Sequence, residues 1–170
     1  MDRERADYVG MMATIMNSLV LRDTFLRLGM EVYNQSGLGV DIIDKIDPEK
    51  AKQAIQDGKI VIFGGGTGKP FFSTDTGSAL RAKDINAEVI LMAKNGVDGV
   101  YTADPDVDPN ATRYDELSFD DIIKQELGVI DLQAAKICKK NKIQGFVFDM
   151  AVKNNIVLAC KGKAVGTLIK

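Results

Sequence analysis

Three short apolar runs, separated by segments with helical spacing, constrain the fold of this chain most. The runs are KIVIF (59–63), EVILMA (88–93) and FVFDM (146–150). The first two are nearly free of polar residues, which is typical of strands buried on both faces of a sheet. Because strands that alternate with helices indicate an α/β domain, we expect a mainly parallel central sheet.

The segments around these runs carry recognisable helix boundaries. Apolar residues follow helical spacing from Met12 to Leu19, and Gly29 is expected to end that first helix. Asp47 is expected to cap the next helix, with Pro48 at its first position. The crowded strands near the C-terminus are expected to add an antiparallel edge. We further expect helices at 74–85, 118–124 and 131–141, and strands at 30–34, 155–160 and 164–169.

The chain contains no histidine among its 170 residues, which excludes the common nucleophilic triads and most zinc chemistry. Cys138 and Cys160 lack CxxC spacing, so we expect two buried thiols in a reducing cytoplasm. A net charge of −2 argues against a mainly electrostatic grip on nucleic acid or membrane. The uncharged run 8–21 has only fourteen residues, too few to cross a bilayer as a helix. We therefore expect a cytoplasmic protein without nucleic-acid or membrane partners.

The stretch GGGTGKPFFSTDTG (64–77) directly follows the first apolar run and suggests a phosphate-binding P-loop. A Walker A loop, G-x-x-x-x-G-K-[ST], requires glycine where Phe63 stands and a hydroxyl where Pro70 stands. The dinucleotide fingerprint G-x-G-x-x-G fails as well, because Lys69 or Phe71 occupies the place of its third glycine. The stretch is therefore neither motif.

Two interpretations of this stretch stay open on spacing alone. A loop between the carboxyl end of a parallel strand and a helix N-terminus favours an anionic ligand. Its two phenylalanines and four hydroxyl residues could contact a planar ring and a phosphate. Alternatively, it is a glycine-rich connection in which Ser73, Thr74 or Asp75 only caps the following helix.

The stretch 93–117 is acidic and rich in turn residues. Asp104, Asp106 and Asp108 follow the spacing of a calcium loop. Pro109 stands where that loop requires glycine, so we reject calcium binding. On composition, a solvated acidic loop is the simpler interpretation.

Two further aspartates mark element boundaries. Asp98-Gly99 is a strong turn signal, and Val100-Tyr101 after it is expected to be briefly extended. Asp131 stands just before an Ala- and Leu-containing helix, where an N-cap is the simplest interpretation. The alternative is a carboxylate that handles magnesium or orients a lysine near a transferring phosphate.

Together these stretches resemble the bacterial uridylate kinases (UMP kinases) of the amino acid kinase family. The resemblance covers essentially all 170 residues and is weakest at 30–57. Its most specific part is GTGKPFFSTDT followed by VDGVYTADP. Further matching pieces are MDRERADYVGMMATIMNSLVLRD, VILMAKNG, YDELSFDDII, LGVIDLQAAKIC and VGTLI.

The resemblance implies a single domain over residues 1–170, with a three-layer αβα architecture and the N-terminal strands of its mainly parallel sheet missing. It implies transfer of the γ-phosphoryl group of ATP to UMP, giving UDP in pyrimidine nucleotide biosynthesis. The implied cofactors are ATP, as phosphate donor, and Mg2+, with no residue predicted as a metal ligand. Such catalysis depends on positioning and charge neutralisation, so a chain without histidine can perform it.

The resemblance also implies which residues hold the acceptor, UMP. Asp7 in the first helix matches an acidic contact, with the ribose as its expected target. In the loop that follows the first apolar run, Thr67 is expected near the base and Thr74 near the phosphate. The whole UMP-binding loop is Thr67, Gly68, Lys69, Pro70, Phe71, Phe72, Ser73 and Thr74.

The donor and catalytic residues are implied in the same way. Asn95, Tyr101 and Asp104 match the ATP site, with Tyr101 beside the adenine and Asp104 on the nucleoside. Asp131 matches the catalytic carboxylate beside the transferring phosphoryl group. Asp75 is either a cap or a second catalytic carboxylate.

Two departures from the family pattern matter. Lys69 stands where family members most often have asparagine, so it adds a cation near UMP or changes the contacts to the base. The family also begins with a strand and a K-x-S-G-E loop that holds phosphates, followed by a second glycine-rich loop with an arginine. Neither occurs here, because Met1 aligns just upstream of the UMP-binding helix.

Two hypotheses follow for the short chain. In the first, the natural protein is a UMP kinase whose start was placed at an internal methionine. In the second, the chain is a truncated, catalytically inactive nucleotide-binding or oligomerisation module. We expect the 170-residue chain alone to be inactive or nearly so, because it lacks the phosphate-holding lysine. The family further implies a homo-oligomer, commonly a hexamer, with GTP and UTP as effectors.

Overall fold

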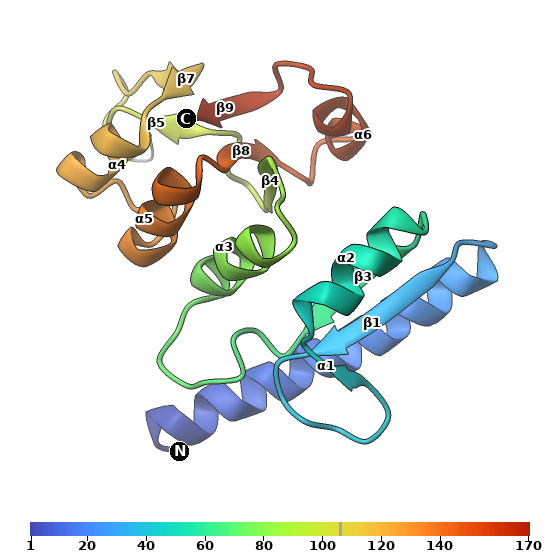
Figure 1. The fold of residues 1–170 in the computed structure, drawn as a ribbon. Helices are drawn as coiled ribbons and strands as arrows, with labels where there is room; N and C mark the ends of the chain where they lie inside the picture. Colours follow the sequence, from blue (N-terminus) through green and yellow to red (C-terminus); the bar gives the residue numbers. More distant parts are fainter. Residues whose placement is uncertain (106) are drawn as a thin grey trace. The chain divides into compact units, whose positions relative to one another are not determined.

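The computed structural model describes residues 1–105 and 107–170, and the chain divides into two compact units. The first unit is Met1–Ile85 and the second is Asn86–Lys170, and each is described by itself. Both units combine helices with strands, which are all parallel in the first unit and mixed in the second, and this confirms the predicted α/β class (Figure 1). The prediction that residues 1–170 form a single domain stays a prediction. Asp106, from the rejected calcium loop, lies outside the described residues.

Helix α1 (Arg3–Arg27) opens the first unit and ends where the sequence indicates. Asp2 caps it by accepting a hydrogen bond from the backbone N–H of Arg5. The chain leaves the helix at Gly29, whose φ of +78° is a left-handed conformation that glycine adopts without strain. Within the described part of the chain, no helix is long and apolar enough to span a membrane.

A three-stranded parallel sheet packs against α1, which contacts its strands β1 and β3 (Figure 1). Strand β3 follows the predicted apolar run, but it is not buried on both faces as expected. Ile62 and Gly64 are buried, whereas Ile60 is 37% exposed, because β3 is an edge strand with a neighbour on one side only. The strands, in the order β2-β1-β3, are β1 (Val32–Ser36), β2 (Asp44–Lys45) and β3 (Ile60–Gly64).

Helices α2 (Pro48–Gln56) and α3 (Thr74–Asp84) complete the first unit, and both confirm predicted helices. Asp47 caps α2 by accepting hydrogen bonds from two backbone N–H groups of its first turn, each at 3.1 Å. The fully buried side chain of Gln35 in β1 donates to the backbone carbonyl of Asp47 and accepts from its N–H. The cap of α2 is therefore fixed to the sheet.

The second unit contains a four-stranded sheet with the order β4-β8-β9-β7. Strand β8 pairs parallel with β4 and antiparallel with β9, which confirms the predicted antiparallel pairing. Strand β9 lies inside the sheet instead of at its edge, because the short β7 pairs with its other side. The elements are β4 (Val89–Lys94), β7 (Glu116–Leu117), α4 (Phe119–Gln125), α5 (Leu132–Asn141), β8 (Gln144–Asp149) and β9 (Gly166–Ile169).

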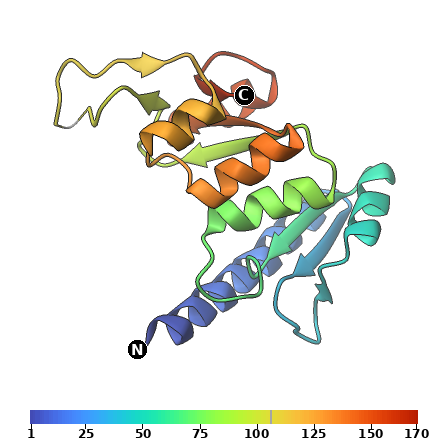
Figure 2. The ribbon, with the colours of Figure 1, turned by 60° about the vertical axis from the view of Figure 1, so that its left-hand side comes forward.

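A short antiparallel ribbon, β5 (Val100–Tyr101) and β6 (Arg113–Tyr114), belongs to the second unit and confirms the predicted extended piece (Figure 2). Thr167 of β9 anchors it, because its Oγ1 accepts a hydrogen bond from the N–H of Val100 at 2.9 Å. The same hydroxyl donates to the carbonyl of Tyr114, and Thr167 is fully buried. One buried side chain therefore holds both strands of the ribbon.

The segment NIVLAC corrects one prediction, because it forms helix α6 (Asn155–Cys160) and not a strand. Asn155 and Ala159, four residues apart, are buried, while Ile156 between them is about half exposed at 49%. The side chain of Asn155 donates a hydrogen bond to the carbonyl of Asp149 and ties the helix to the end of β8. Short apolar runs suit helices and strands equally well, so the sequence pattern alone did not distinguish the two.

The two cysteines differ in exposure. Cys138 lies buried in α5, as expected. Cys160 is exposed at the end of α6, so the prediction of two buried thiols is wrong for this residue. The apolar run around Cys160 buries only one narrow face of its helix, which leaves the thiol in solvent.

Candidate active site

The glycines after β3 allow two backbone segments to pack closely at the ends of β1 and β3. Gly65, Gly66 and Gly68 all have left-handed φ values, between +55° and +73°. A Cβ atom on Gly68 would lie 2.1 Å from the carbonyl oxygen of Gly37, which no side chain tolerates. The glycines of this loop therefore allow its backbone to pack closely against Gly37.

Helix α1 holds the beginning of this loop through two hydroxyl side chains. Thr14 Oγ1 accepts a hydrogen bond from the N–H of Gly65 at 2.9 Å, across 51 residues of sequence. Gly64 lies so close to α1 that an added Cβ would meet Ser18 Oγ at 2.8 Å. Ser18 is buried and also accepts a hydrogen bond from Asn34 Nδ2 of β1 at 3.2 Å. The loop, the helix and the sheet thus share one tightly packed corner.

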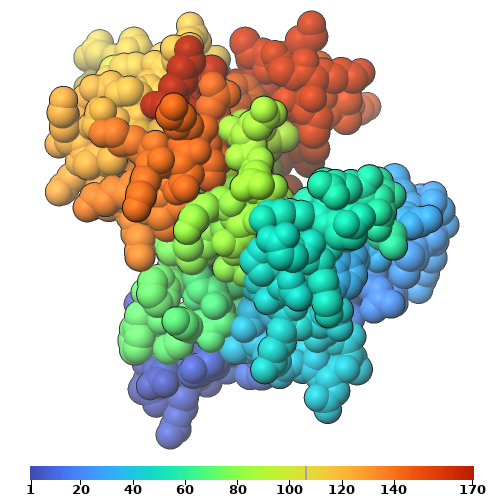
Figure 3. Space-filling model, viewed as in Figure 1, coloured from blue at the N-terminus to red at the C-terminus, as the bar shows by residue number. Residues whose placement is uncertain are grey.

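Asp7 lies against the far end of the loop, so the structure brings these two predicted UMP contacts together. Its Oδ2 accepts a hydrogen bond from the N–H of Phe71 at 2.7 Å, although 64 residues separate them. Its Oδ1 lies 2.9 Å from Arg3 Nε. The hydrogen bond from Phe71, followed by the interaction with Arg3, lowers the pKa of Asp7 below its ordinary value of 3.8. Figure 3 shows the green atoms of the loop against the dark blue atoms at the start of α1.

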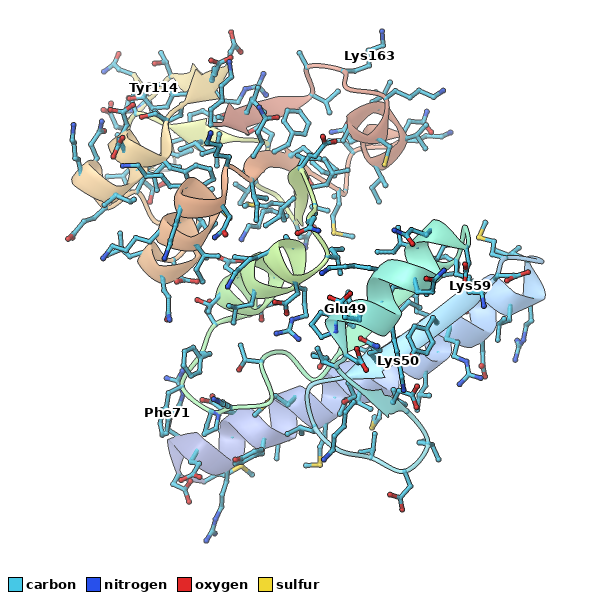
Figure 4. The ribbon with its side chains drawn as sticks, in the orientation of Figure 1. Glu49, Lys50, Lys59, Phe71, Tyr114 and Lys163 are labelled. Atoms are coloured by element: carbon cyan, nitrogen blue, oxygen red, sulfur yellow. The ribbon has the colours of Figure 1, made fainter. Side chains whose placement is uncertain are left out.

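The middle of the loop is folded on itself and presents two aromatic rings. Thr67 Oγ1 accepts from the N–H of Lys69 at 3.2 Å and donates to its carbonyl at 3.0 Å. Phe71 is 64% exposed and Phe72 is 42% exposed (Figure 4, where Phe71 is labelled). The φ of Phe71 is +67°, which is rare for a bulky residue and is held here by the hydrogen bond to Asp7. Exposed rings of this kind can stack on a planar ligand.

The loop ends at the N-terminus of α3, where Ser73 is the cap. Its Oγ accepts a hydrogen bond from the N–H of Thr76 at 2.9 Å. Thr74 is the first helical residue, and Asp75 lies half-buried in the first turn. Of the three capping residues that the sequence left open, the structure selects Ser73. The N-terminus of a helix favours a negatively charged group, so a phosphate beside Thr74 fits this position.

In the second unit, Asn95 stands at the carboxyl ends of two neighbouring parallel strands. It directly follows β4, and the N–H of Gly96 donates to Asp149 Oδ1 at the end of β8, at 3.1 Å. The N–H of Met150 donates to the carbonyl of Lys94 at 2.8 Å. Parallel α/β sheets commonly bind their ligands at such ends, and the nucleotide contact of Asn95 stays a prediction.

Tyr101 and Asp104, the other predicted ATP contacts, follow on the ribbon and the turn after it. The hydroxyl of Tyr101 donates to Asp98 Oδ1 at 2.9 Å. This hydrogen bond is the main cause that raises the pKa of Tyr101 above its ordinary value of 10.0. The carbonyl of Asp104 accepts from the N–H of Asp108 at 2.8 Å, which closes a turn and leaves the residue exposed.

Asp131 is the N-cap of α5, as one of the two interpretations of the sequence predicted. Its Oδ1 accepts hydrogen bonds from the N–H of Gln133 at 2.9 Å and of Ala134 at 3.0 Å. The side chain is half-buried, so the cap fixes a carboxylate at the edge of the helix. Its catalytic role and that of Asp75 stay predictions.

Sequence reasoning missed three side chains that support these positions. Thr14 lies inside an apolar stretch, where only the three-dimensional contact with the glycine loop identifies it. Asp98 was interpreted as a turn residue only, and Arg113 had no role at all. Arg113 Nη1 lies 3.0 Å from Asp98 Oδ2. Asp98 and Arg113 are 15 positions apart, and opposite charges at such a separation are too common in a sequence to predict an ion pair.

Comparison with known proteins gives consistent matches. Residues 1–149 match the Amino acid kinase family. The uridylate kinase of Paenarthrobacter aurescens (strain TC1) is 45% identical over 170 residues, which covers 99% of this chain and 69% of that protein. The uridylate kinase of Streptomyces avermitilis is 42% identical, covering 99% of this chain and 68% of that protein.

Solved structures agree with these sequence relatives. The UMP kinase from Bacillus anthracis superimposes with a TM-score of 0.95 at 35% identity, covering 100% of this chain and 70% of that chain. The UMP kinase from Ureaplasma parvum gives a TM-score of 0.94 at 38% identity, covering 100% and 73%. The matches cover the residues of both units described above.

Proposed function

The chain belongs to the amino acid kinase family, and we propose that it is a UMP kinase that transfers the γ-phosphoryl group of ATP to UMP and gives UDP. Its uridylate kinase relatives support this activity. The structural observation that carries the proposal is the hydrogen bond from the N–H of Phe71 to Asp7 at 2.7 Å. It joins the proposed ribose contact to the loop proposed to bind the base.

The acceptor site of this proposal lies on the first unit. Asp7 accepts hydrogen bonds from ribose hydroxyls, and the exposed rings of Phe71 and Phe72 contact the uracil from the loop tip. The phosphate lies at the N-terminus of α3 beside Thr74, where backbone N–H groups and the helix dipole favour an anion. Lys69, which is exposed, adds a cation on the same loop.

The donor site of this proposal lies on the second unit, and ATP with Mg2+ is its ligand. Asn95 and Asp104 bind polar groups of the nucleotide, and Tyr101 stacks beside the adenine. Among the described residues, no three or more His, Cys, Asp or Glu side chains are grouped to hold a metal ion. Mg2+ commonly keeps few protein ligands and enters such sites on nucleotide phosphates.

The chemistry proposed for the protein residues is positioning and charge control. Phosphoryl transfer needs the attacking oxygen of UMP aligned with the γ-phosphorus, and Mg2+ neutralises developing charge when it is bound with ATP. The carboxylate of Asp131 is held by its cap contacts, and Asp75 lies in the first turn of α3. We assign Asp131 as the catalytic carboxylate beside the transferring phosphoryl group and Asp75 as a second catalytic carboxylate.

We also propose that the chain forms a homo-oligomer. Val9, Met12, Met16 and Val20 recur at helical spacing on α1 and are 48–68% exposed. An apolar stripe on a helix surface is typical of a face that a partner covers. A hexamer, control by GTP and UTP, a cytoplasmic location, and the lack of nucleic-acid or membrane partners stay predictions.

Calorimetric titration with separate nucleotides tests the proposed function. We expect UMP to bind better than CMP or AMP, and MgATP to bind the UMP-saturated chain at a second site. ³¹P NMR of the mixture then follows UDP formation, which we expect to be barely detectable for this chain alone. Because K-x-S-G-E is not among these residues, the transfer is expected to be slow and needs a high protein concentration.

Three results would contradict the proposal. The first is a chain that binds neither nucleotide. The second is competition between UMP and MgATP for one site, because the proposal places them on different units. The third is a preference for CMP or AMP over UMP as ligand, which would point to another acceptor.

A further inference from the structure

Asp98 contacts two side chains of the ribbon with its two carboxylate oxygens. Oδ1 accepts the hydroxyl hydrogen bond of Tyr101 at 2.9 Å, and Oδ2 lies 3.0 Å from Arg113 Nη1. Arg113 Nη1 also lies 3.4 Å from the backbone carbonyl of Asp98. The guanidinium therefore fixes the carboxylate, and the carboxylate fixes the phenol.

The backbone of the ribbon is built to allow this arrangement. A Cβ atom on Gly99 would lie 2.6 Å from Arg113 Cδ and 2.6 Å from Thr167 Oγ1. The stem of Arg113 therefore crosses directly over Gly99 to reach Asp98. Thr167 holds the next residue, Val100, by a hydrogen bond from its N–H at 2.9 Å. Glycine at this position therefore leaves the space through which the side chain of Arg113 reaches Asp98.

These contacts contribute little to the stability of the fold. The side chain of Asp98 is 46% exposed and that of Arg113 is 32% exposed, and ion pairs in solvent are weak. Their main effect is on the orientation of the Tyr101 side chain, which Asp98 contacts directly. A hydrogen bond to a charged acceptor restrains the rotation of the Tyr101 ring, because turning the ring away breaks it.

We propose that Asp98 and Arg113 are positioning residues, which hold the ring of Tyr101 in the orientation that receives the adenine of ATP. The proposal rests on the assignment of Tyr101 to the ATP site. Neither residue touches the nucleotide, and Asp98 acts on binding only through the phenol. A pre-oriented ring does not lose rotational freedom when ATP binds, so the affinity for ATP rises.

The first test measures the phenol without any nucleotide. The chain has four tyrosines and no tryptophan, so the absorbance of the phenolate is easily followed with pH. The difference between wild type and Tyr101→Phe gives the titration of Tyr101 alone. We expect a pKa above 10.0, and Asp98→Asn should lower it, whereas Asp115→Asn in the same unit should not. A Tyr101 curve that Asp98→Asn leaves unmoved overturns the proposal.

The second test is a double-mutant cycle on the dissociation constant of MgATP. We expect Asp98→Ala to weaken ATP binding about tenfold, from loss of one hydrogen bond to a charged group. In the Tyr101→Phe background the same change should cost almost nothing, because the ring no longer has a hydroxyl to hold. Arg113→Lys should weaken ATP binding less than Asp98→Ala, and UMP binding should stay unchanged throughout.

The outcomes separate the inference from the proposed function. A full tenfold loss in the Tyr101→Phe background means that Asp98 acts by another route, which overturns the inference. An equal loss of UMP affinity points to general damage of the fold and overturns it too. A wild-type chain that binds no ATP overturns the proposed function and the adenine assignment, while the phenol titration still decides whether Asp98 holds the ring.

Discussion

Asp7 combines two tasks on a single carboxylate. One oxygen faces Arg3, and the other accepts the N–H of Phe71. An ionised carboxylate offers about four acceptor positions, so these contacts leave room for ribose hydroxyls. The residue that we assign to the ribose therefore also keeps the loop in place, and its protonation should release the loop.

The pH dependence of this contact follows from the direction of the pKa shift. The N–H of Phe71, and then Arg3, lower the pKa of Asp7 below 3.8 in the folded chain. The stabilisation is therefore complete above pH 3.8 and is lost only as the pH falls through the lower folded value. We expect the amide signal of Phe71 in ¹⁵N NMR to titrate with a midpoint below 3.8.

Arg3→Ala is the matched control for this titration. It should raise the midpoint only partly, because the larger cause, the N–H of Phe71, remains. A midpoint at or above 3.8 in the wild type would show that the hydrogen bond does not hold the loop in solution. The same conclusion would follow if the signal of Phe71 did not respond to the protonation of Asp7.

At the scale of elements, substitutions of the cap residue Asp131 can test its effect on stability and its proposed effect on catalysis separately. Asp131 holds the start of α5 through two backbone N–H groups. Asparagine caps nearly as well as aspartate, so Asp131→Asn should change the free energy of unfolding by less than about 0.5 kcal/mol. The same substitution removes the negative charge, and kcat for UDP formation should fall at least about 100-fold.

Asp131→Ala completes this comparison. It removes both the cap and the charge, so it should lose kcat and also about 1 kcal/mol of stability in urea unfolding. Transfer of label from γ-labelled ATP to UDP gives kcat for the three proteins. If Asp131→Asn retains the wild-type kcat, the residue is a cap only and the catalytic assignment is wrong.

The sequence predicted elements well wherever the deciding interactions are local. The caps at Asp47 and Asp131 and the stop at Gly29 each depend on neighbours within a few residues, and all three are confirmed. Helix α6 was missed, because an apolar run of six residues has no clear period, and its contact with the end of β8 is not visible in the local sequence.

The resemblance to the family supplied the proposed site residues but not the contacts that hold them. The resemblance named Asp7 and Tyr101, yet not how each is held. The contacts that hold them join residues far apart, 64 positions between Asp7 and Phe71 and 15 between Asp98 and Arg113. Pairs at such separation follow from how the strands and helices pack, which no local pattern contains.

At the scale of the whole molecule, the proposed UMP and ATP sites lie on different units. The residues proposed for UMP all lie in Met1–Ile85, and those proposed for ATP lie in Asn86–Lys170. The chain spans 69% of the length of its relative from Paenarthrobacter aurescens. Because K-x-S-G-E is absent from these 170 residues, we expect nucleotide binding to be stronger evidence of function than the rate of transfer.

The most direct test of the account is therefore the affinity for UMP with and without the carboxylate of Asp7. Calorimetry should show that Asp7→Asn weakens UMP binding at least about tenfold, because a neutral amide accepts hydrogen bonds from the ribose hydroxyls and from the N–H of Phe71 more weakly than a carboxylate does. Asp2→Asn, which makes the same charge change on α1 and keeps its cap, should bind UMP like the wild type. Equal affinities of wild type and Asp7→Asn, or no UMP binding by the wild type, would contradict the account.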